Sequence, residues 1–339
     1  MSESSPDLPV ADAVDTTLAT RIAYLSRPDS YPERPSTVEA IETRLSWVFL
    51  TPERAWKLKK PVSYDHLDFS SIEARWRDCQ AEVRLNRPLA PDVYLGVEAL
   101  TARPHGLLEI GGDGAPVDYL VCMRRLPSAR CLENQIRAGE PEAGEVARAA
   151  EVLADFYAGA PTVGAVDPDA LAEEVDMHAR ELEGLALGPD AGVGALRDRL
   201  AEAIAAQRAC LASRQRREVH GDLRPQHVYP GEPPVFLDRL TFRRDLRLMD
   251  PAEELAFLAL DTERLGSAWV GEVFVDAYRR ATGDTVPTSV FACYRARRAL
   301  LWALLSGRHL LRGGPERPWR ERTRAYLALG LASLSTGAD

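Results

Sequence analysis

The spacing of hydrophobic residues changes near residue 127, and this change constrains the fold more than any other feature of the sequence. Before it, short runs of strand type are separated by turn-forming residues, and after it apolar residues recur mainly at helical spacing. We expect an α+β chain in which a small antiparallel sheet carrying one helix precedes a larger, mainly helical part. The expected strands span 46–50, 55–62, 93–99, 107–110 and 118–123, and the expected helices 144–158, 170–185, 194–214, 251–265, 267–282, 289–311 and 318–333.

The one helix of the β-rich part is predicted to begin at Ser70. Glu73 follows three positions later, as in a capping box, and Trp76, Cys79 and Val83 recur at helical spacing. One face of this helix should therefore pack inward.

Composition and length divide the chain into three segments. Residues 1–36 are rich in Ser, Pro and Asp, so we expect a flexible N-terminal tail with one short helix near 17–25. Residues 37–126 should form a small β-rich lobe, and residues 127–339 a helical lobe that contains one hairpin. At 339 residues the chain is long enough for two such lobes, each with its own core.

Net charge and hydropathy exclude several classes of protein. The net charge of −9 argues against general nucleic-acid binding, which usually requires a basic face. No stretch reaches the roughly 18 uncharged apolar residues of a membrane span, and the acidic N-terminus lacks the apolar core of a signal peptide. The five cysteines are dispersed, which is typical of reduced thiols. We therefore expect a cytoplasmic protein with no membrane or nucleic-acid partner.

The stretch VHGDLRPQHVYPGEPPVFLDRL, from Val219 to Leu240, interrupts the helical part with an apparent β-hairpin. Asp222 and Asp238 lie on opposite sides of its turn. Because a hairpin returns the chain to its starting end, we expect the two carboxylates to lie close together, as a metal–phosphate site requires. The alternative is that Asp222 caps a turn and Asp238 merely ends a strand.

Two positions upstream have the residue types that phosphate binding needs. Lys57 lies in the expected strand 55–62, and Lys59 shares its face and is the rival candidate for contacting phosphate. Glu82 lies at the margin of the buried stripe of the predicted helix, where a carboxylate can reach a strand. The alternative is that the lysines only protect an edge strand and that Glu82 is solvated.

Strand lysine, helix glutamate, His-Gly-Asp loop, hairpin and second aspartate follow one another in the order of a kinase fold. With HGDLRPQHV followed by VFLD, and MDPAEELAFLALD further on, the sequence resembles the aminoglycoside phosphotransferase group of kinase-like enzymes. It is more similar still to a bacterial branch of aminoglycoside-phosphotransferase-like proteins, with which it shares TRLSWVFLTPERAWKLKKPV, LDFSSIEAR and EVRLNRPLAPDVYLGV. The resemblance extends from Val38 to about Leu265 and implies a two-lobed protein-kinase-like fold.

The resemblance also implies a role for each of the four candidate residues. Asp222 would be the catalytic residue that engages the acceptor hydroxyl. Asp238 would bind magnesium in place of the aspartate of the DFG motif. Lys57 would bind the α- and β-phosphates of ATP, and Glu82 would pair with it.

The same resemblance implies the remaining ligands. The segment Val121–Pro127 would hold adenine by backbone hydrogen bonds, with Met123, Arg124 and Arg125 as the nucleotide-binding residues. The cofactors would be ATP and Mg²⁺. The partner would be a small-molecule hydroxyl acceptor, such as an aminoglycoside, a sugar or a related metabolite.

Two departures from the kinase pattern leave more than one function open. His227 lies five residues after Asp222, where kinases carry a metal-binding asparagine. It is expected to contact the metal or phosphate or to orient Asp222, and the alternative is a hairpin histidine with no ligand. The turn Thr51–Arg54 contains no glycine, whereas kinases cover the phosphates with a glycine-rich turn.

The first hypothesis is therefore an ATP- and Mg²⁺-dependent phosphotransferase acting on a small-molecule hydroxyl. The second is a nucleotide-binding pseudokinase with a regulatory role. A protein kinase is a third, which the absence of HRD and APE signatures from the sequence disfavours.

Overall fold

The computed structural model describes residues 16–64, 67–103, 107–185, 187, 192–312 and 316–335. It divides into two compact units. Unit 1 comprises Met1–Leu126 and Thr241–Arg243, and unit 2 comprises Pro127–Leu240 and Arg244–Asp339. Unit 1 contains an antiparallel sheet and unit 2 is mainly helical, so the predicted fold class is confirmed.

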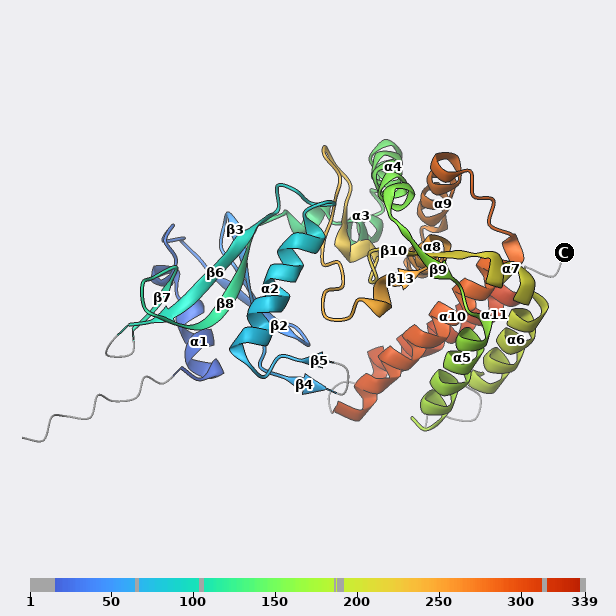
Figure 1. Ribbon diagram of the computed structural model, residues 1–339, viewed down its shortest axis with the longest axis horizontal. Helices are drawn as coiled ribbons and strands as arrows, with labels where there is room; N and C mark the ends of the chain where they lie inside the picture. The colour runs from blue at the N-terminus through green and yellow to red at the C-terminus, as the bar shows by residue number, and fades with distance from the viewer. Residues whose placement is uncertain are drawn as a thin grey trace, which may run out of the picture. The chain divides into compact units, whose positions relative to one another are not determined.

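Unit 1 is built on a six-stranded antiparallel sheet (Figure 1). Its strands are, in spatial order, β1 (Glu39–Glu42), β2 (Ser46–Leu50), β3 (Arg54–Lys59), β8 (Ala115–Arg124), β6 (Tyr94–Ala102) and β7 (Leu108–Ile110). A separate pair is formed by β4 (Ser63–Tyr64) and β5 (Leu67–Asp68). Lys57 of β3 lies opposite Val48 on one side and Val121 on the other. Because β3 is paired on both sides, the alternative that its lysines protect an edge strand is wrong.

Helix α2 (Ile72–Asn86) packs on one face of this sheet, against β6 and β8 (Figure 1). Its N-cap is Ser71, whose hydroxyl accepts a hydrogen bond from the backbone amide three residues later at 3.1 Å. The predicted cap at Ser70 was wrong by one residue, because the Ser70 amide donates to Asp68 Oδ1 at 2.9 Å in the preceding turn. Trp76, predicted on the packed face, is 42% exposed.

A short helix, α1 (Leu18–Leu25), supplies Leu25 to the core on the other face of the sheet. Arg21 of α1 also forms a buried ion pair with Asp118 of β8. The predicted short helix is therefore confirmed. Since it contributes to the core, residues 17–36 belong to unit 1 and not to a tail, which corrects the predicted boundary. Residues 1–15 of the predicted tail lie outside the described residues.

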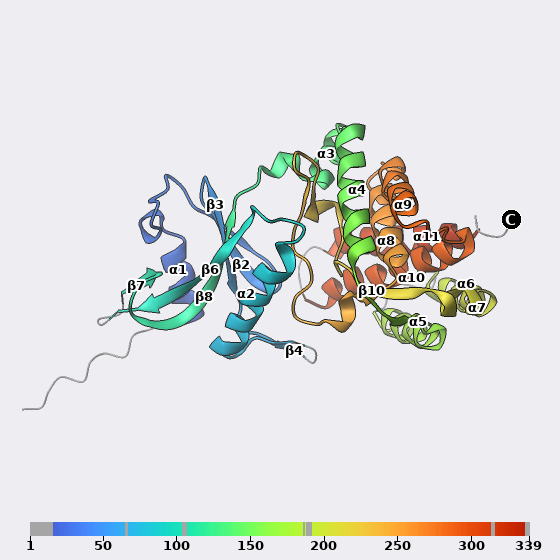
Figure 2. The same ribbon diagram turned by 45° about the horizontal axis from the view of Figure 1, so that its top comes forward.

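Unit 2 consists mainly of helices, with α10 packed along α11 and α4 along α9 (Figures 1 and 2). Its helices are α3 (Leu132–Ala138), α4 (Ala143–Gly159), α5 (Pro168–Glu183), α6 (Val193–Ala206), α7 (Arg208–Ser213), α8 (Pro251–Arg264), α9 (Ala268–Thr282), α10 (Thr288–Gly307) and α11 (Glu316–Ser335). Every residue of α8 from Pro251 to Thr262 is buried, as in a helix at the centre of a domain. The predicted helix 194–214 is divided at Gln207 into α6 and α7.

The stretch from Val219 to Leu240 contains the predicted hairpin. β11 (Val228–Tyr229) pairs with β12 (Val235–Phe236) in antiparallel register. The strand before it, β10 (Gln215–Glu218), pairs with β9 (Thr162–Ala165) and β13 (Leu248–Met249). These three strands were not predicted, because four or fewer residues carry little periodicity.

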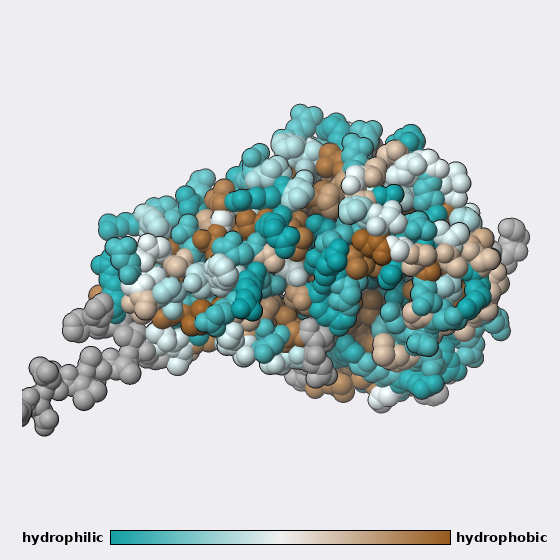
Figure 3. Space-filling view, in the orientation of Figure 1, coloured by the Kyte–Doolittle hydropathy of each residue, from teal (hydrophilic) through white to brown (hydrophobic). Residues whose placement is uncertain are grey.

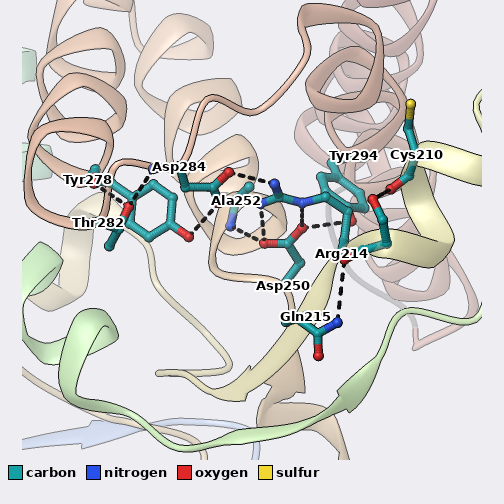
Figure 4. A network of polar contacts seen from close by, with 10 residues as sticks. Cys210, Arg214, Gln215, Asp250, Ala252, Tyr278, Thr282, Asp284 and Tyr294 are labelled. Atoms are coloured by element: carbon teal, nitrogen blue, oxygen red, sulfur yellow. Dashed lines mark hydrogen bonds and ion pairs between the residues drawn. The ribbon is translucent and has the colours of Figure 1, made fainter.

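An arginine directly before β10 joins this small sheet to the helices (Figure 4). Arg214 lies between two carboxylates: its Nε is 2.6 Å from Asp250 Oδ2, and its Nη1 is 2.6 Å from Asp284 Oδ1. Tyr294 donates a hydrogen bond to Asp250 at 2.9 Å, and Tyr278 donates one to Asp284 at 2.8 Å. Each of these charges therefore has partners, as buried ions require.

On the face seen in Figure 3, hydrophilic side chains cover most of the surface and hydrophobic ones lie in small groups. Within the described part of the chain, no helix is both long and apolar enough to cross a membrane. The five cysteines, all of them described, are free thiols, and only Cys210 is exposed.

Candidate functional site

One candidate site lies in unit 1, where β3 faces α2. The Nζ atom of Lys57 is 2.8 Å from Oε1 of Glu82, whose side chain is only 1% exposed. A buried carboxylate of this kind needs a cation beside it. The fold thus brings the predicted lysine and the predicted glutamate together.

A second lysine, Lys59, shares the same carboxylate. Its Nζ contacts Oε2 of Glu82 and lies 2.5 Å from Oδ2 of Asp78. Burial lowers the pKa of Lys59, but the two carboxylates outweigh burial and leave that pKa above its ordinary value. The side chain of Lys59 is 5% exposed, against 14% for Lys57. Lys59 is therefore enclosed by carboxylates, and Lys57 is the more accessible of the two.

A separate candidate site lies in unit 2, in the loop that follows β10. Gly221 has a φ of 92°, and a Cβ there would lie 2.8 Å from Cγ of Arg247, so this position requires glycine. Glu254 of α8 accepts hydrogen bonds from the backbone amide of His220, at 2.9 Å, and from that of Gly221. The loop that carries Asp222 is thus anchored to the buried helix α8.

Asp222 is partly accessible, with 32% of its side chain exposed. Partial burial raises the pKa of its carboxyl above the ordinary range, against the opposing effect of His227. His220 is fully buried, and burial lowers the pKa of its ring to about 3, so it is neutral near pH 7. Its Nε2 lies 2.9 Å from the carbonyl oxygen of Leu237 and must carry the proton, since a carbonyl only accepts. His220 therefore braces the loop.

His227 lies between the two aspartates. Its Nδ1 is 2.7 Å from the backbone carbonyl oxygen of Asp222, and its Nε2 is 4.0 Å from Oδ2 of Asp238. Because the carbonyl oxygen only accepts, Nδ1 carries a proton, and in the neutral ring Nε2 then keeps its lone pair. Nε2 also lies 3.1 Å from the side-chain amide nitrogen of Gln226. The loop and hairpin thus place Asp222, His227 and Asp238 together.

The two residues after Asp238 are hydrogen-bonded to Val219 and His220, which directly follow β10. The φ of Asp238, 61°, is uncommon for a residue other than glycine. The guanidinium of the next residue, Arg239, donates to the carbonyl of Val219 at 2.9 Å, and the amide of Leu240 donates to the carbonyl of His220 at 3.1 Å. Half of the Asp238 side chain is exposed. Its neighbours therefore hold the backbone in this conformation while the carboxylate remains accessible.

His227 and Asp238 fit a divalent cation as two of its ligands. The 4.0 Å between Nε2 and Oδ2 can be spanned by two ligand bonds of roughly 2.1 Å each. Among the residues that the structure describes, no group of three or more His, Cys, Asp or Glu could hold a metal ion by itself. A cation at this pair would need further ligands from water and phosphate, which is how magnesium is usually bound in nucleotide enzymes.

The chain is similar to several solved structures of small-molecule kinases. A choline kinase from Cryptosporidium parvum matches with a TM-score of 0.55 and 10% identity, over 95% of this chain and 96% of that one. A thermostable mutant of aminoglycoside phosphotransferase APH(4)-Ia matches with a TM-score of 0.53 and 14% identity, over 89% and 95% of the two chains. The chain has the kinase-like fold of the aminoglycoside phosphotransferases and choline kinases.

A third structure with this kinase-like fold, a glucosamine kinase in complex with glucosamine, ADP and inorganic phosphate, matches with a TM-score of 0.51. Its identity is 15%, over 86% of this chain and 79% of that one. Curated relatives include the uncharacterized proteins Rv2004c of Mycobacterium tuberculosis and Mb2027c of Mycobacterium bovis, each 32% identical over 291 residues and 82% of this chain. The chain spans 56% of the length of these relatives. No protein-family profile matches it.

The predicted adenine-binding residues lie at the end of β8 in this kinase-like fold. Met123 is paired within the sheet on both sides. The backbone amide of Arg124 donates to Val93, and that of Arg125 donates to Glu53, both at 2.9 Å. An adenine would therefore have to be recognised by other atoms of segment 121–127.

The glycine-free turn Thr51–Arg54 closes on itself. The Thr51 amide donates to the Arg54 carbonyl at 2.9 Å, and the Arg54 amide donates to Oγ1 of Thr51 at 3.1 Å. Pro52 has no amide hydrogen, so at most the Glu53 amide can be offered to phosphate. The turn therefore has fewer unbonded backbone amides than phosphate binding by a glycine-rich kinase turn would use.

Three residues that support the loops were not predicted: Glu254, Tyr157 and Arg239. Tyr157 donates a hydrogen bond to Glu254, which is 2% exposed. A glutamate directly before the apolar run of α8 was an available signal, since a buried carboxylate needs donors. Tyr157 and Arg239 gave no such signal, because their partners, Glu254 and Val219, are far from them in sequence and meet them only in the folded chain.

Proposed function

We propose that this chain is a phosphotransferase that uses ATP and a divalent cation to move the γ-phosphate to a hydroxyl of a small molecule. An aminoglycoside, a sugar or a related metabolite is the expected acceptor. The observation that carries this proposal is the position of His227 between two aspartates: its ring nitrogens lie 3.9 Å from Oδ2 of Asp222 and 4.0 Å from Oδ2 of Asp238. The kinase-like fold supports it, since the similar solved structures are small-molecule kinases.

Lys57 is the residue proposed to bind the nucleotide phosphates. Phosphoryl transfer depends mainly on positioning and charge neutralisation, and Lys57 supplies a positive charge that Glu82 holds in place. Lys59 stays bound to Asp78 and Glu82. The buried carboxylates therefore keep a cation when the Lys57 ammonium turns toward phosphate.

Asp222 is proposed to orient the acceptor hydroxyl and to take its proton. Its raised pKa makes it a stronger base than an exposed aspartate, and its partial exposure leaves the carboxylate accessible. The bonds of Glu254 and His220 fix the loop before a substrate arrives. A cation held by His227 and Asp238 would neutralise charge on the phosphates.

A nucleotide-binding pseudokinase with a regulatory role is the second candidate. The closed turn Thr51–Arg54 favours it, because two of its amides are already bonded within the turn. Such a protein would bind nucleotide and leave the γ-phosphate in place.

The two candidates are separated by an assay of ADP release with ATP and either Mg²⁺ or Mn²⁺. The acceptor panel should include aminoglycosides, amino sugars, neutral sugars and amino alcohols. The phosphotransferase predicts acceptor-dependent ADP release, which Asp222→Ala lowers by a factor of ~100 or more while nucleotide binding remains. Nucleotide binding without acceptor-dependent release across the panel supports the pseudokinase. A chain that binds no nucleotide contradicts both.

A further inference from the structure

The residue that departs from the kinase pattern, His227, has the hydrogen bonding of a metal ligand. Its Nδ1–H donates to the backbone carbonyl of Asp222 at 2.7 Å. Metal-binding histidines almost always donate their other ring N–H to a carbonyl or carboxylate, which fixes the tautomer and the ring orientation. The bond to Asp222 leaves Nε2 as the atom that can bind a cation.

The Nε2 atom faces a second ligand. It lies 4.0 Å from Oδ2 of Asp238, and the ring is 10% exposed while half of the Asp238 side chain is exposed. The ring is therefore held by the protein, and the carboxylate opposite it is half exposed to solvent. At present Nε2 accepts a hydrogen bond from the amide of Gln226, an exposed side chain that a cation could displace.

The backbone keeps this pair in register. The amide of Leu237 donates to the carbonyl of His227 at 2.8 Å, directly before Asp238. His227 directly precedes β11 and Asp238 follows β12 by two residues, so the two ligands flank a pair of bonded strands. The backbone therefore keeps the two residues side by side before a cation binds.

We propose that this site selects a first-row transition cation, such as Mn²⁺ or Co²⁺, over Mg²⁺, with Nε2 of His227 as a direct ligand. The inference rests on the proposed function only in that phosphate oxygens complete the coordination. Mg²⁺ prefers oxygen ligands and gives up its water reluctantly, whereas a mixed nitrogen and oxygen site favours first-row transition cations, with an affinity that rises from Mn²⁺ to Co²⁺. An asparagine at this position would offer oxygen, and the histidine offers nitrogen instead.

The test is electron paramagnetic resonance of Mn²⁺ bound to the full chain in the presence of ADP. Loss of the free-ion signal measures binding, and competition with Mg²⁺ measures the preference. Spin-echo modulation then reports nitrogen ligands. Protein labelled with ¹⁵N only at histidine should show ¹⁵N coupling in place of ¹⁴N coupling, which distinguishes a histidine ligand from the nitrogens of the nucleotide.

Two variants show which histidine supplies the nitrogen that couples to Mn²⁺. His227→Asn should remove the histidine coupling, weaken Mn²⁺ binding by roughly tenfold or more, and reduce the preference over Mg²⁺. His309→Asn, which changes a histidine of the segment after α10, should leave the coupling unchanged. If His227→Asn does not fold, the labelled wild-type chain still shows whether any histidine is a ligand, and absence of histidine coupling there overturns the proposal.

Bound Mn²⁺ without histidine coupling overturns the proposal and leaves His227 with the role of orienting Asp222. Absence of Mn²⁺ binding also overturns it. The proposed phosphotransferase activity is tested by a different result. Phosphate transfer with Mg²⁺ and no histidine coupling would keep the phosphotransferase and remove the metal preference, whereas histidine coupling without transfer would do the reverse.

Discussion

The carboxylate of Glu254 accepts a hydrogen bond from the backbone amide of His220 at 2.9 Å, across 34 residues of sequence. The same carboxylate binds the amide of Gly221. One buried side chain of α8 thus holds two consecutive peptide groups directly before Asp222. The position of the proposed catalytic carboxylate depends on this helix and not on the loop alone.

Replacing Glu254 by leucine should destabilise the fold by about 2–4 kcal/mol, because two buried amides lose their acceptor. Urea unfolding measures the loss, and hydrogen exchange at His220 and Gly221 should accelerate. Tyr157→Phe is the matched control, since it removes a donor to the same carboxylate but leaves both amides bonded. It should cost about 1 kcal/mol. Equal costs for the two variants would contradict the anchoring role.

The two lysines of β3 should separate into a ligand-binding one and a structural one. Lys57→Met should weaken nucleotide binding by roughly tenfold or more, as measured by calorimetry, since a charged hydrogen bond is lost. Its unfolding free energy should change little, because Lys59 still neutralises Glu82. Lys59→Met should instead cost about 3–5 kcal/mol, because Asp78 and Glu82 lose a buried cation. The reverse pattern would make Lys59 the phosphate ligand.

Arg239 should act as a positioning residue for Asp238. Arg239→Met removes the guanidinium that donates to the backbone carbonyls of Glu218 and Val219, and should cost about 2–3 kcal/mol and speed hydrogen exchange at Leu240. Arg244→Met is the control, since that side chain is 63% exposed and pairs with the same Glu218 that Arg239 approaches. If Arg239→Met has the same unfolding free energy and the same hydrogen-exchange rate at Leu240 as the control, the positioning role is excluded.

Acid should destabilise unit 2 through Asp284. Burial raises the pKa of Asp284, but the hydrogen bonds from Arg214 and Tyr278 outweigh burial and leave that pKa below its ordinary value. Between the folded and the unfolded pKa, the unfolded chain binds more protons. The contribution of Asp284 is therefore present above about pH 4 and is lost as the pH falls through the folded value.

Asp284→Asn tests this sign. The variant should be less stable than the wild type at pH 7, and the difference should shrink below about pH 4 when unfolding is followed across pH. Asp276→Asn, at a side chain that is 58% exposed, serves as the control and should show no such convergence. A difference that stays constant with pH would exclude the ion pair as its source.

The sequence predicted the candidate site residues where their order along the chain is typical of a kinase fold. Lys57, Glu82, Asp222 and Asp238 follow the order that a kinase fold requires, and the hairpin turn predicts that the two aspartates meet. The pairing of Glu82 with both Lys57 and Lys59 was not predictable, because it depends on how α2 packs on β3. Likewise, Glu254 could be recognised as a buried carboxylate, but its two amide partners are defined only once α8 packs beneath the loop.

The N-terminal boundary failed for a different reason. Residues 17–36 have the composition of a tail, yet α1 supplies Leu25 to the core and its Arg21 to buried Asp118. The average composition of a segment does not show that two of its side chains, here Leu25 and Arg21, are enough to hold it on the sheet. Short strands such as β9 and β10 were missed because their length gives no usable periodicity.

Transfer of the γ-phosphate itself is the most direct test of the proposed function. The chain is incubated with ATP carrying ¹⁸O in its γ-phosphate, with Mn²⁺ or Mg²⁺ and the acceptor panel, and the products are read by mass spectrometry. We predict a phosphorylated acceptor that carries the ¹⁸O label with the wild-type chain and none with Asp222→Ala. Intact ATP across the panel with nucleotide bound, or equal product from Asp222→Ala, would contradict the assignment of this chain as a phosphotransferase.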